Sequence, residues 1–372
     1  MKSILFVGMD VHKNSFNLCC YNSYTGEYIE ERRCAAVASN VEKFINDVRA
    51  KYPEEELDFK CGYEAGCLGF YLYKQLKAKN IDCDILAPTS MQTSAKNKVI
   101  KNDRLDARNI ALNLASKSYS AVHIPKKEDL KVKEYIRMIA SFKKSLKKIK
   151  QYINAYLLRY GFHYDGKSKW TGAHIKWIKS LEMEDLFKEV LNEYMLEYDH
   201  LVDVIGRFTS KLNEIYQSEK YINMVSKLRC FKGIDTLSGM IIHVETSGFD
   251  RFPSAKAYSS YVGLGNGEHS SGDKNNRTGT TKMGNSTLRT TFVECAQSLV
   301  KGYVYDAKSK ALKARQKGQS GDTIAYADKA TKRLMKKYRS LINRNVPHNK
   351  AIVAVARELA CFVWGMETGN IY

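Results

Sequence analysis

The sequence predicts an α/β domain followed by two mainly helical regions. Strand-like apolar runs alternate with helix patterns up to about residue 120. Between residues 126 and 220, apolar side chains recur at alternating spacings of three and four, as in heptad helices. From residue 221 onwards the pattern stays helical, apart from a Gly/Ser/Asn-rich loop over 263–285. We therefore expect three domains, at 1–122, 123–220 and 221–372.

The first domain is expected to begin with three antiparallel strands. The apolar run 4–10 is the first strand, and a hairpin over 15–34 turns at 22–26. Ser39 to Glu42 has the pattern of a capping box, which predicts a helix to about Lys51. The remaining expected elements are a strand at 57–64, a helix at 68–79, a strand at 81–86 and a helix from Asp103. This order is that of an RNase H-like or RuvC-like fold.

Four acidic residues are the strongest candidates for a site. Asp10 and Glu64 each end an apolar strand, and Asp103 and Asp106 are three apart at a helix start. An i, i+3 pair shares one helix face, and hard carboxylate oxygens suit Mg²⁺ or Mn²⁺. Two such ions about 4 Å apart could support phosphoryl transfer on nucleic acid. Singly, each acid could be a surface carboxylate or, for Asp103, a helix cap.

The central region predicts two long helices that form an antiparallel hairpin or a dimerising coiled coil. Residues 126–160 carry 11 Lys and Arg against 3 Asp and Glu, whereas 182–203 carry 8 acidic residues and one lysine. The first helix, with Lys143 and Lys147, could therefore face nucleic acid. A structural spacer with solvated faces is an equal alternative.

The last region contains two further candidates. The segment 263–272 is rich in glycine and serine and precedes Lys274 and Arg277, so that a DNA backbone could approach a serine closely. From the residues alone, an ordinary surface loop is the better interpretation. Residues 228–239 predict helix, glycine-containing turn and helix, which is either a phosphate-binding element or a plain helix corner.

Charge and composition restrict the class of partner. The chain has 60 Lys and Arg against 40 Asp and Glu, a net charge of +20. Such an excess favours polyphosphate partners, although a basic protein with no such role is the alternative. The nine cysteines lack zinc spacing. No apolar stretch reaches the roughly 18 residues of a membrane span, and no signal peptide is evident, so we expect a bacterial cytoplasmic, nucleoid-associated protein without membrane contact.

The motifs, taken in order, resemble the DEDD insertion-sequence transposases, which are related to Piv-type DNA invertases and include bridge-RNA-guided recombinases. Residues 8–13 (GMDVHK), 63–66 (YEAG) and 102–108 (NDRLDAR) resemble the family's acidic motifs. Residues 261–264 (YVGL), 270–272 (SSG), 282–285 (KMGN) and 288–289 (LR) resemble its C-terminal signature. Residues 233–235 resemble its helix-hairpin-helix, but lack the second glycine.

The resemblance implies a serine nucleophile, which would be Ser271, with Ser270 as the fallback. It also implies a composite centre, in which carboxylates of one protomer meet the serine of another, within dimers that assemble into tetramers. Donor and target double-stranded DNA and a structured guide RNA are the implied partners, with Lys274, Arg277, Lys282 and Arg289 among the expected nucleic-acid contacts. The alternatives are a RuvC-like metal-dependent nuclease and a non-catalytic RNA- or DNA-binding protein.

Overall fold

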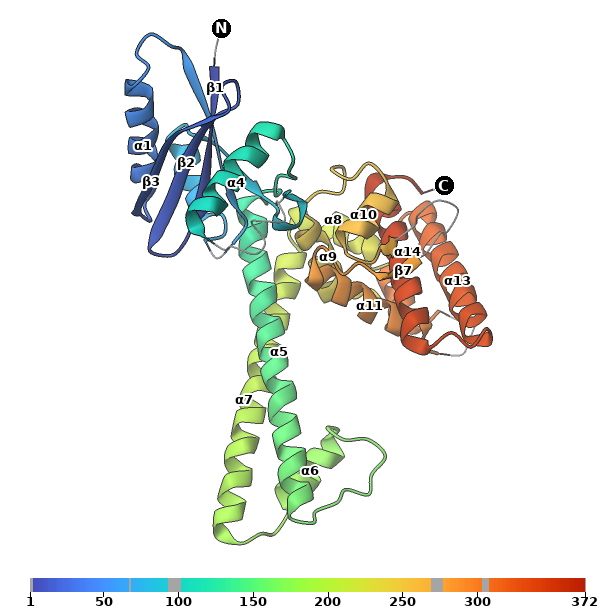
Figure 1. Cartoon of the computed structure of the whole chain (residues 1–372). Helices are drawn as coiled ribbons and strands as arrows, with labels where there is room; N and C mark the ends of the chain where they lie inside the picture. The colour runs from blue at the N-terminus through green and yellow to red at the C-terminus, as the bar shows by residue number, and fades with distance from the viewer. Residues whose placement is uncertain (1–2, 67, 93–101, 269–276, 303–307, 372) are drawn as a thin grey trace. The chain divides into compact units, whose positions relative to one another are not determined.

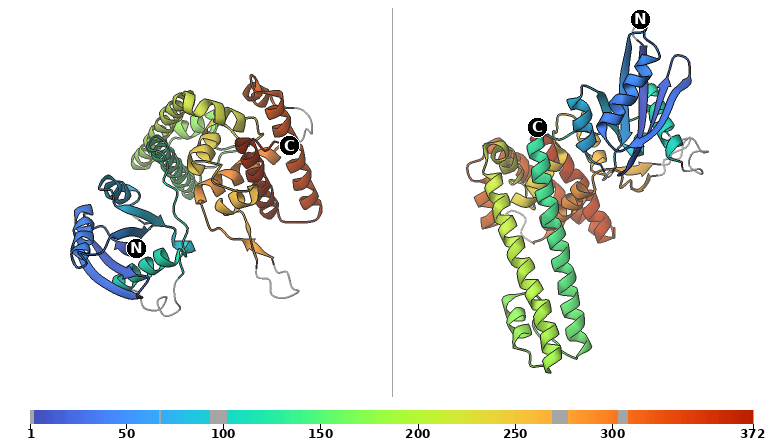
Figure 2. Two further views of the ribbon diagram at one scale, coloured as in Figure 1. Left: turned by 90° about the horizontal axis from the view of Figure 1, so that it is seen from above. Right: turned by 90° about the vertical axis from the view of Figure 1, so that its left-hand side faces the viewer.

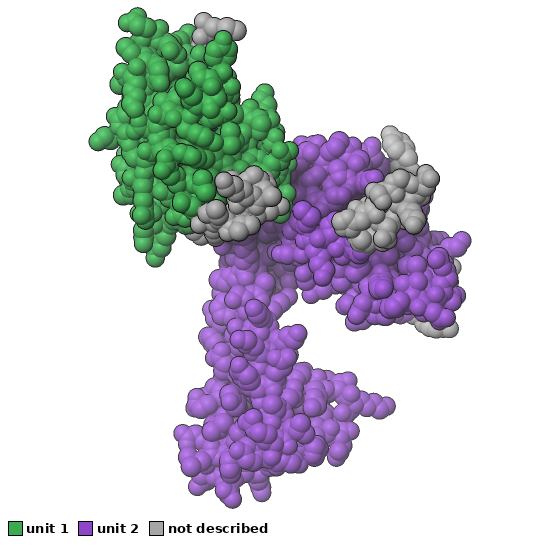
Figure 3. Space-filling view, viewed as in Figure 1, with its two compact units in different colours: residues 1–124 green, residues 125–372 purple. Residues whose placement is uncertain are grey.

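The computed structural model describes residues 3–66, 68–92, 102–268, 277–302 and 308–371. The chain divides into two compact units, residues 1–124 and 125–372 (Figure 3). Each unit is described separately below. Among the described residues, no helix is both long and apolar enough to cross a membrane.

Unit 1 is built on a five-stranded mixed sheet of order β3-β2-β1-β4-β5 (Figure 1). β1 pairs antiparallel with β2, which pairs antiparallel with β3, while β1, β4 and β5 run parallel. The strands are β1 (Ser3–Val11), β2 (Ser15–Asn22), β3 (Glu27–Ala35), β4 (Leu57–Glu64) and β5 (Asp82–Leu86). The expected α/β region with three antiparallel strands first is confirmed.

The two faces of the sheet are covered by different helices. Leu5, Val7 and Met9 of β1 share a buried core with α1 (Ala38–Ala50) and α2 (Tyr71–Ala78). Side chains alternate along a strand, so Phe6, Gly8 and Asp10 point to the opposite face. Phe6 packs there with α4 (Asp103–Ser116), after the short 3₁₀ helix η1 (Pro88–Ser90). Asp10 therefore lies on the face that α4 covers.

Two glycines allow α4 to lie directly on the sheet. Gly8 of β1 and Gly62 of β4 are partners in the parallel register. A methyl group at Gly8 would lie 2.1 Å from the carbonyl oxygen of Ala107 and 2.3 Å from the backbone nitrogen of Ala111. A methyl group at Gly62 would lie 2.7 Å from Leu86 and 2.9 Å from Leu114. Glycine at these positions is a requirement of close helix–strand packing.

Unit 2 begins with a long antiparallel helix pair, α5 (Lys127–Arg159) and α7 (Asp185–Tyr216). Tyr135 contacts Phe208, with ring centroids 5.5 Å apart, and Tyr156 contacts Tyr194, at 5.9 Å. A residue later in α5 thus contacts a residue earlier in α7, which means that the two helices run in opposite directions. They lie side by side in the views of Figures 1 and 2. The two apolar repeats therefore pack within one chain. The connector holds a helix that was not predicted from the sequence, α6 (Gly172–Ser180).

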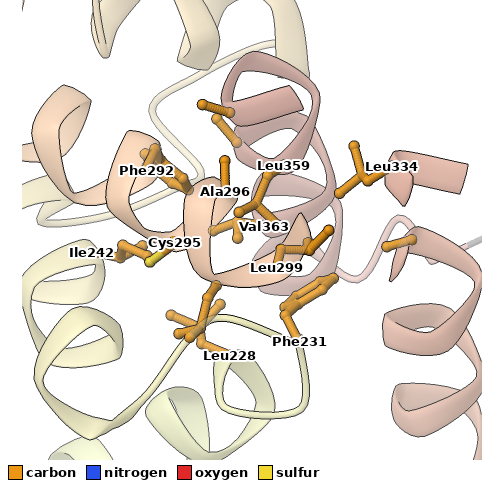
Figure 4. Packing of buried hydrophobic residues seen from close by; sticks show 14 of the residues in the cluster. Leu228, Phe231, Ile242, Phe292, Cys295, Ala296, Leu299, Leu334, Leu359 and Val363 are labelled. Atoms are coloured by element: carbon orange, nitrogen blue, oxygen red, sulfur yellow. The ribbon is translucent and has the colours of Figure 1, made fainter. Parts of the chain in front are cut away.

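The remainder of unit 2 is helical around one large core, part of which Figure 4 shows. Leu228, Phe292 and Leu359 are fully buried there. The elements are α8 (Glu219–Leu228), α9 (Thr236–Thr246), α10 (Ala255–Tyr261), β6 (Asn266–Glu268), β7 (Arg277–Thr280), α11 (Ser286–Val300), α12 (Lys310–Gln316), α13 (Gly321–Asn343) and α14 (His348–Thr368). A smaller core joins α5 and α7 to α8 and α9. The expected division at residue 220 stays a prediction.

Two local expectations are resolved by the structure. The capping box at Ser39 to Glu42 is wrong, because the N-cap of α1 is Val37, two residues before Ser39, and it makes no side-chain cap bond. The helix–turn–helix over 228–239 is confirmed, with Asp235 and Ser238 forming a capping box at α9. A methyl group at Gly233 would lie 2.4 Å from the carbonyl oxygen of Cys295, so this glycine serves helix packing. These contacts favour the plain helix corner.

We predict that Gly8→Ala separates α4 from the sheet. The added methyl group meets backbone atoms, which cannot rotate away, so the substitution should destabilise unit 1 by about 3 kcal/mol or more. Hydrogen–deuterium exchange should rise in α4 and β1 of the full chain. Gly206→Ala in α7 is the matched control, since nothing lies within 4 Å of its added methyl group. Unchanged protection of α4 in the Gly8 variant would contradict this account.

Candidate active site

The ends of two parallel strands bring the first pair of acids to one edge of the sheet. Met9 of β1 is the partner of Tyr63 of β4, so Asp10 and Glu64 are the next residues along their strands. The side chain of Asp10 is largely buried, at 17% exposure, whereas Glu64 is exposed. The register thus brings the two residues to the same edge.

The second pair of acids lies in the first turn of α4. The N-cap is Asn102, whose side-chain oxygen accepts a hydrogen bond of 2.9 Å from the backbone N–H of Arg104. Asp103 is therefore inside the helix and is not its cap. Asp103 and Asp106 are both stabilised by the unpaired N–H groups of this helix end. Because Asn102 makes the side-chain cap bond, neither carboxylate is needed as the cap of α4.

His12 connects the two elements and was not among the predicted site residues. Its Nε2 atom lies 3.1 Å from Oδ2 of Asp10 and 3.9 Å from Oδ1 of Asp103. Asp10, His12 and Asp103 each offer one ligand atom, and these atoms lie within 4.8 Å of one another. Among the residues that the structure describes, this group is the candidate metal site. The sequence signal that could have identified His12 is its position two residues after Asp10.

Negative charge is concentrated around Asp10. Burial raises the pKa of Asp10, and the nearby carboxylates of Asp103 and Asp106 raise it further, while His12 opposes them. Asp106 is therefore close enough to act on Asp10, although it is not in the three-residue group. Glu64 is not in that group either. Carboxylates that repel one another fit a hard divalent cation, which would offset the repulsion.

A half-buried glutamate of β3, on the same face of the sheet as Gly8, also holds α4. Glu31 of β3 accepts hydrogen bonds from both Arg104 and Arg108, which are four residues apart on α4. Arg108 also lies over the ring of Tyr28, 4.6 Å from its centroid. Burial raises the pKa of Glu31, but the hydrogen bonds and charges of Arg108 and Arg104 outweigh it, and the pKa lies below its ordinary value. The two arginines of this motif thus hold the helix in place.

The serine segment of unit 2 is described only at its root. Ser270, Ser271 and Lys274 lie outside the described residues, as does the side chain of Arg277. β6 and β7 pair antiparallel on either side of this segment, as a hairpin. We call residues 261–266 and 280–285 the hairpin root.

Glycines hold the hairpin root together. A methyl group at Gly284 would lie 2.1 Å from the carbonyl oxygen of Tyr261, and one at Gly263 would lie 2.8 Å from that of Met283. Both glycines have positive φ, which other residues rarely adopt. Arg289 donates a hydrogen bond of 2.9 Å to the carbonyl oxygen of Lys282. The two strands of chain that lead into the hairpin are therefore held in close contact.

The other predicted nucleic-acid contacts differ in availability. Lys143 and Lys147 are exposed and four residues apart, so they lie on one face of α5. Lys282 is exposed at the hairpin root, with a positive φ. Arg289 is partly buried, and its guanidinium bonds to the backbone of the root. Lys143, Lys147 and Lys282 are therefore better placed for an external partner than Arg289.

We predict that Glu31→Gln weakens divalent-metal binding without removing a metal ligand. Loss of the negative charge weakens the hydrogen bonds from both arginines, which should cost about 1–3 kcal/mol and loosen the start of α4. Because folding lowers the pKa of Glu31, its stabilisation is complete above the ordinary pKa and is lost as pH falls through the lowered value. Calorimetric titration with Mn²⁺ should show a reduced affinity.

The matched control for Glu31 is Glu42→Gln in the same unit. Glu42 is paired with Lys79 on the surface, at 2.6 Å, and is remote in sequence from both strand ends of the site. Its loss should leave Mn²⁺ affinity unchanged. Equal effects of the two substitutions would show that α4 does not depend on the Glu31 contacts.

The chain matches known transposases over most of its length. Residues 7–162 match a transposase model of the DEDD IS110 type, and residues 225–310 match the transposase IS116/IS110/IS902 family. A putative transposase, y4qE, of Sinorhizobium fredii is 29% identical over 97% of this chain and 88% of its own length. The transposase for insertion sequence element IS1533 of Leptospira borgpetersenii is 29% identical over 92% of this chain and 97% of its own. The transposase for insertion sequence element IS1111A of Coxiella burnetii is 25% identical over 88% of this chain and 88% of its own length.

These matches cover both the acidic site and the hairpin root, and they imply a divalent metal and a phosphoryl-transfer reaction on DNA. The chain belongs to the IS110 family of DEDD transposases.

Proposed function

We propose that this transposase cleaves and rejoins DNA with the carboxylates of unit 1 and a serine of the hairpin in unit 2, Ser271, with Ser270 as the fallback. The observation that carries the proposal is the meeting of Asp10 and Asp103 at the start of α4, within 4.8 Å of one another and of His12. α4 reaches this position because Gly8 admits its backbone.

Asp10 and Asp103 would hold the metal, with Glu64 and Asp106 completing the acidic set. Oxygen donors favour Mg²⁺ or Mn²⁺. A divalent ion there would offset negative charge on the phosphate that reacts. His12 suits such an ion less well than the carboxylates do, so we assign it a positioning role: its ring nitrogen donates to Oδ2 of Asp10 and fixes that carboxylate.

The serine would supply the nucleophile. The serine hydroxyl loses its proton as its oxygen bonds to phosphorus. The bond from phosphorus to one sugar oxygen breaks, and that oxygen takes up a proton and leaves as a hydroxyl. Attack by another sugar hydroxyl reverses the step, releases the serine and rejoins the DNA. The hairpin root supports this role because its glycine contacts and the Arg289 bond fix where the serine segment begins and ends.

The remaining features concern partners and assembly. Donor and target duplexes would bind along the basic surfaces, and a structured guide RNA would contact Lys143 and Lys147 of α5. Carboxylates of one protomer and the serine of another would form the reaction centre, in dimers that assemble into tetramers. We further propose an RNase H-like fold for unit 1 and a three-domain organisation at 1–122, 123–220 and 221–372.

We predict that Ser271→Ala and Asp10→Asn each abolish recombination of a plasmid that carries the gene with its flanking DNA. The serine variant should also lose the covalent protein–DNA adduct, which denaturing gels and peptide mapping detect. Circular dichroism should show both variants folded.

Ser270→Ala is the matched control for the serine assignment. An adduct that persists in the Ser271 variant and disappears in the Ser270 variant would move the role to Ser270. Metal-dependent nicks without any adduct in the unmodified protein would instead identify a RuvC-like nuclease. Nucleic-acid affinity with neither nicks nor joined products would identify a binding protein.

We predict that His12→Ala lowers Mn²⁺ affinity by roughly 10- to 100-fold, as is typical for the loss of a group that orients a metal ligand. His12→Gln should retain part of the affinity, because its amide N–H can still donate to Asp10. An alanine variant with unchanged Mn²⁺ affinity and recombination rate would remove His12 from the site.

A further inference from the structure

A surface pocket of about 410 Å³ lies in unit 2 beside the hairpin root. It is formed by α10, β6, α13 and α14, and six of its lining residues carry the argument. These are Lys256, Ser259, Asn266, Lys337, Arg357 and Glu358. Its volume is within the range of ordinary ligand sites.

The pocket carries more positive than negative charge. Lys256, Lys337 and Arg357 face a single carboxylate, Glu358. That carboxylate is already paired with Lys337, at 2.6 Å, and with Arg333 outside the pocket. Lys256 has no acidic partner among the described residues, and Arg357 is bonded to an uncharged amide. The excess positive charge therefore favours an anionic ligand.

Ser259 supplies a second, independent indication. The residue is 4% exposed, and its hydroxyl is buried without any hydrogen-bond partner among the described atoms. Its backbone oxygen is bonded to the N–H of Leu264, so only the hydroxyl is unsatisfied. A buried hydroxyl without a partner costs about 1–3 kcal/mol. Ser259 lines the pocket, and its hydroxyl oxygen, which has almost no accessible surface in this conformation, would meet a ligand oxygen after rotation about χ1.

The donor set identifies the chemistry of the ligand. Lysine, arginine and a serine hydroxyl can all donate hydrogen bonds to phosphate oxygens, which only accept them. Such contacts hold a nucleic-acid backbone in register without reading its sequence. A phosphodiester therefore fits the pocket by both charge and hydrogen bonding.

The pocket is attached to the hairpin. Arg357 of α14 donates a hydrogen bond to the side-chain oxygen of Asn266, the first residue of β6. Ser271 follows Asn266 by five residues in the sequence. Even a fully extended chain spans at most about 18 Å over that length, a few nucleotides of one strand. A DNA phosphate in the pocket would thus lie a few nucleotides along the same DNA strand from the phosphate that the serine attacks.

We propose that this pocket binds a backbone phosphodiester of the DNA strand that the serine hairpin engages, a few nucleotides from the reacting phosphate. The DNA assignment, in place of RNA, rests on the function proposed above for the hairpin. Lys256 and Ser259 contact the phosphate, and Arg357 fixes the pocket against β6. The pocket sets the position of the DNA strand relative to the serine hairpin.

Binding of a short fluorescent duplex by the full-length protein tests the site. Anisotropy titrations at several KCl concentrations, with EDTA present, measure binding without cleavage. Lys256→Ala should lower the magnitude of the slope of log K against log salt by about 0.9, and should reduce affinity roughly fivefold at physiological salt. Lys256→Arg should restore the slope. Lys350→Ala, on α14 but outside the pocket, is the control and should bind as the unmodified protein does.

Ser259→Ala separates ligand binding from a structural role. Removal of an unsatisfied buried hydroxyl should leave the melting temperature unchanged or higher, whereas the affinity for the duplex should fall about two- to tenfold. Duplex binding equal to that of the unmodified protein in both the Lys256→Ala and Ser259→Ala variants would overturn the proposal. If these variants lost affinity for a structured RNA probe and kept their affinity for the duplex, the DNA assignment would be overturned. Neither result depends on catalysis, so failure of the serine mechanism would be seen separately, in the adduct assay.

Discussion

The direct contact between the backbone of α4 and that of β1 is the constraint on which the acidic site depends. A strand and a helix normally meet through side chains, which leave room for the helix to shift. At Gly8 there is no side chain, and the carbonyl of Ala107 and the N–H of Ala111 lie where a methyl group would be. The position of Asp103 relative to Asp10 is then set by backbone geometry.

The same device recurs in unit 2, at the hairpin root and at the helix corner. Gly284 lies against the carbonyl of Tyr261, and Gly233 lies against that of Cys295. In each case a glycine permits an approach that positions a neighbouring segment. In unit 1 the contacts of Glu31, on the same sheet face as Gly8, add a polar restraint on α4, so this helix is held both by packing and by charge.

Much of the fold could be predicted from the sequence, because its strands and long helices have clear apolar patterns. The helix start at Asp103 was predicted correctly. The two long helices were predicted as either an antiparallel hairpin or a dimerising coiled coil, and the contacts between α5 and α7 are those of the hairpin. The elements that were missed include the nine-residue helix α6 in the connector and two short strands: β6 has three residues and β7 four, too few for a periodic signal. Contacts between distant residues leave no local signal at all, and for that reason Glu31 was not predicted to meet Arg104 and Arg108. His12 was missed because an exposed polar residue after a strand has no pattern of its own.

The contact at Gly8 also constrains how the acidic motif could vary. Successive residues of a helix are rotated by about 100°, so inserting one residue between Asp106 and Ala107 would turn both aspartates away from Asp10 while Ala107 stayed against β1. The spacing from Asp103 to Ala107 is therefore fixed by the pitch of the helix. Outside these five residues, insertions before Asn102 would leave that geometry intact. Relatives that keep the site should accordingly differ in length before the motif and never within it.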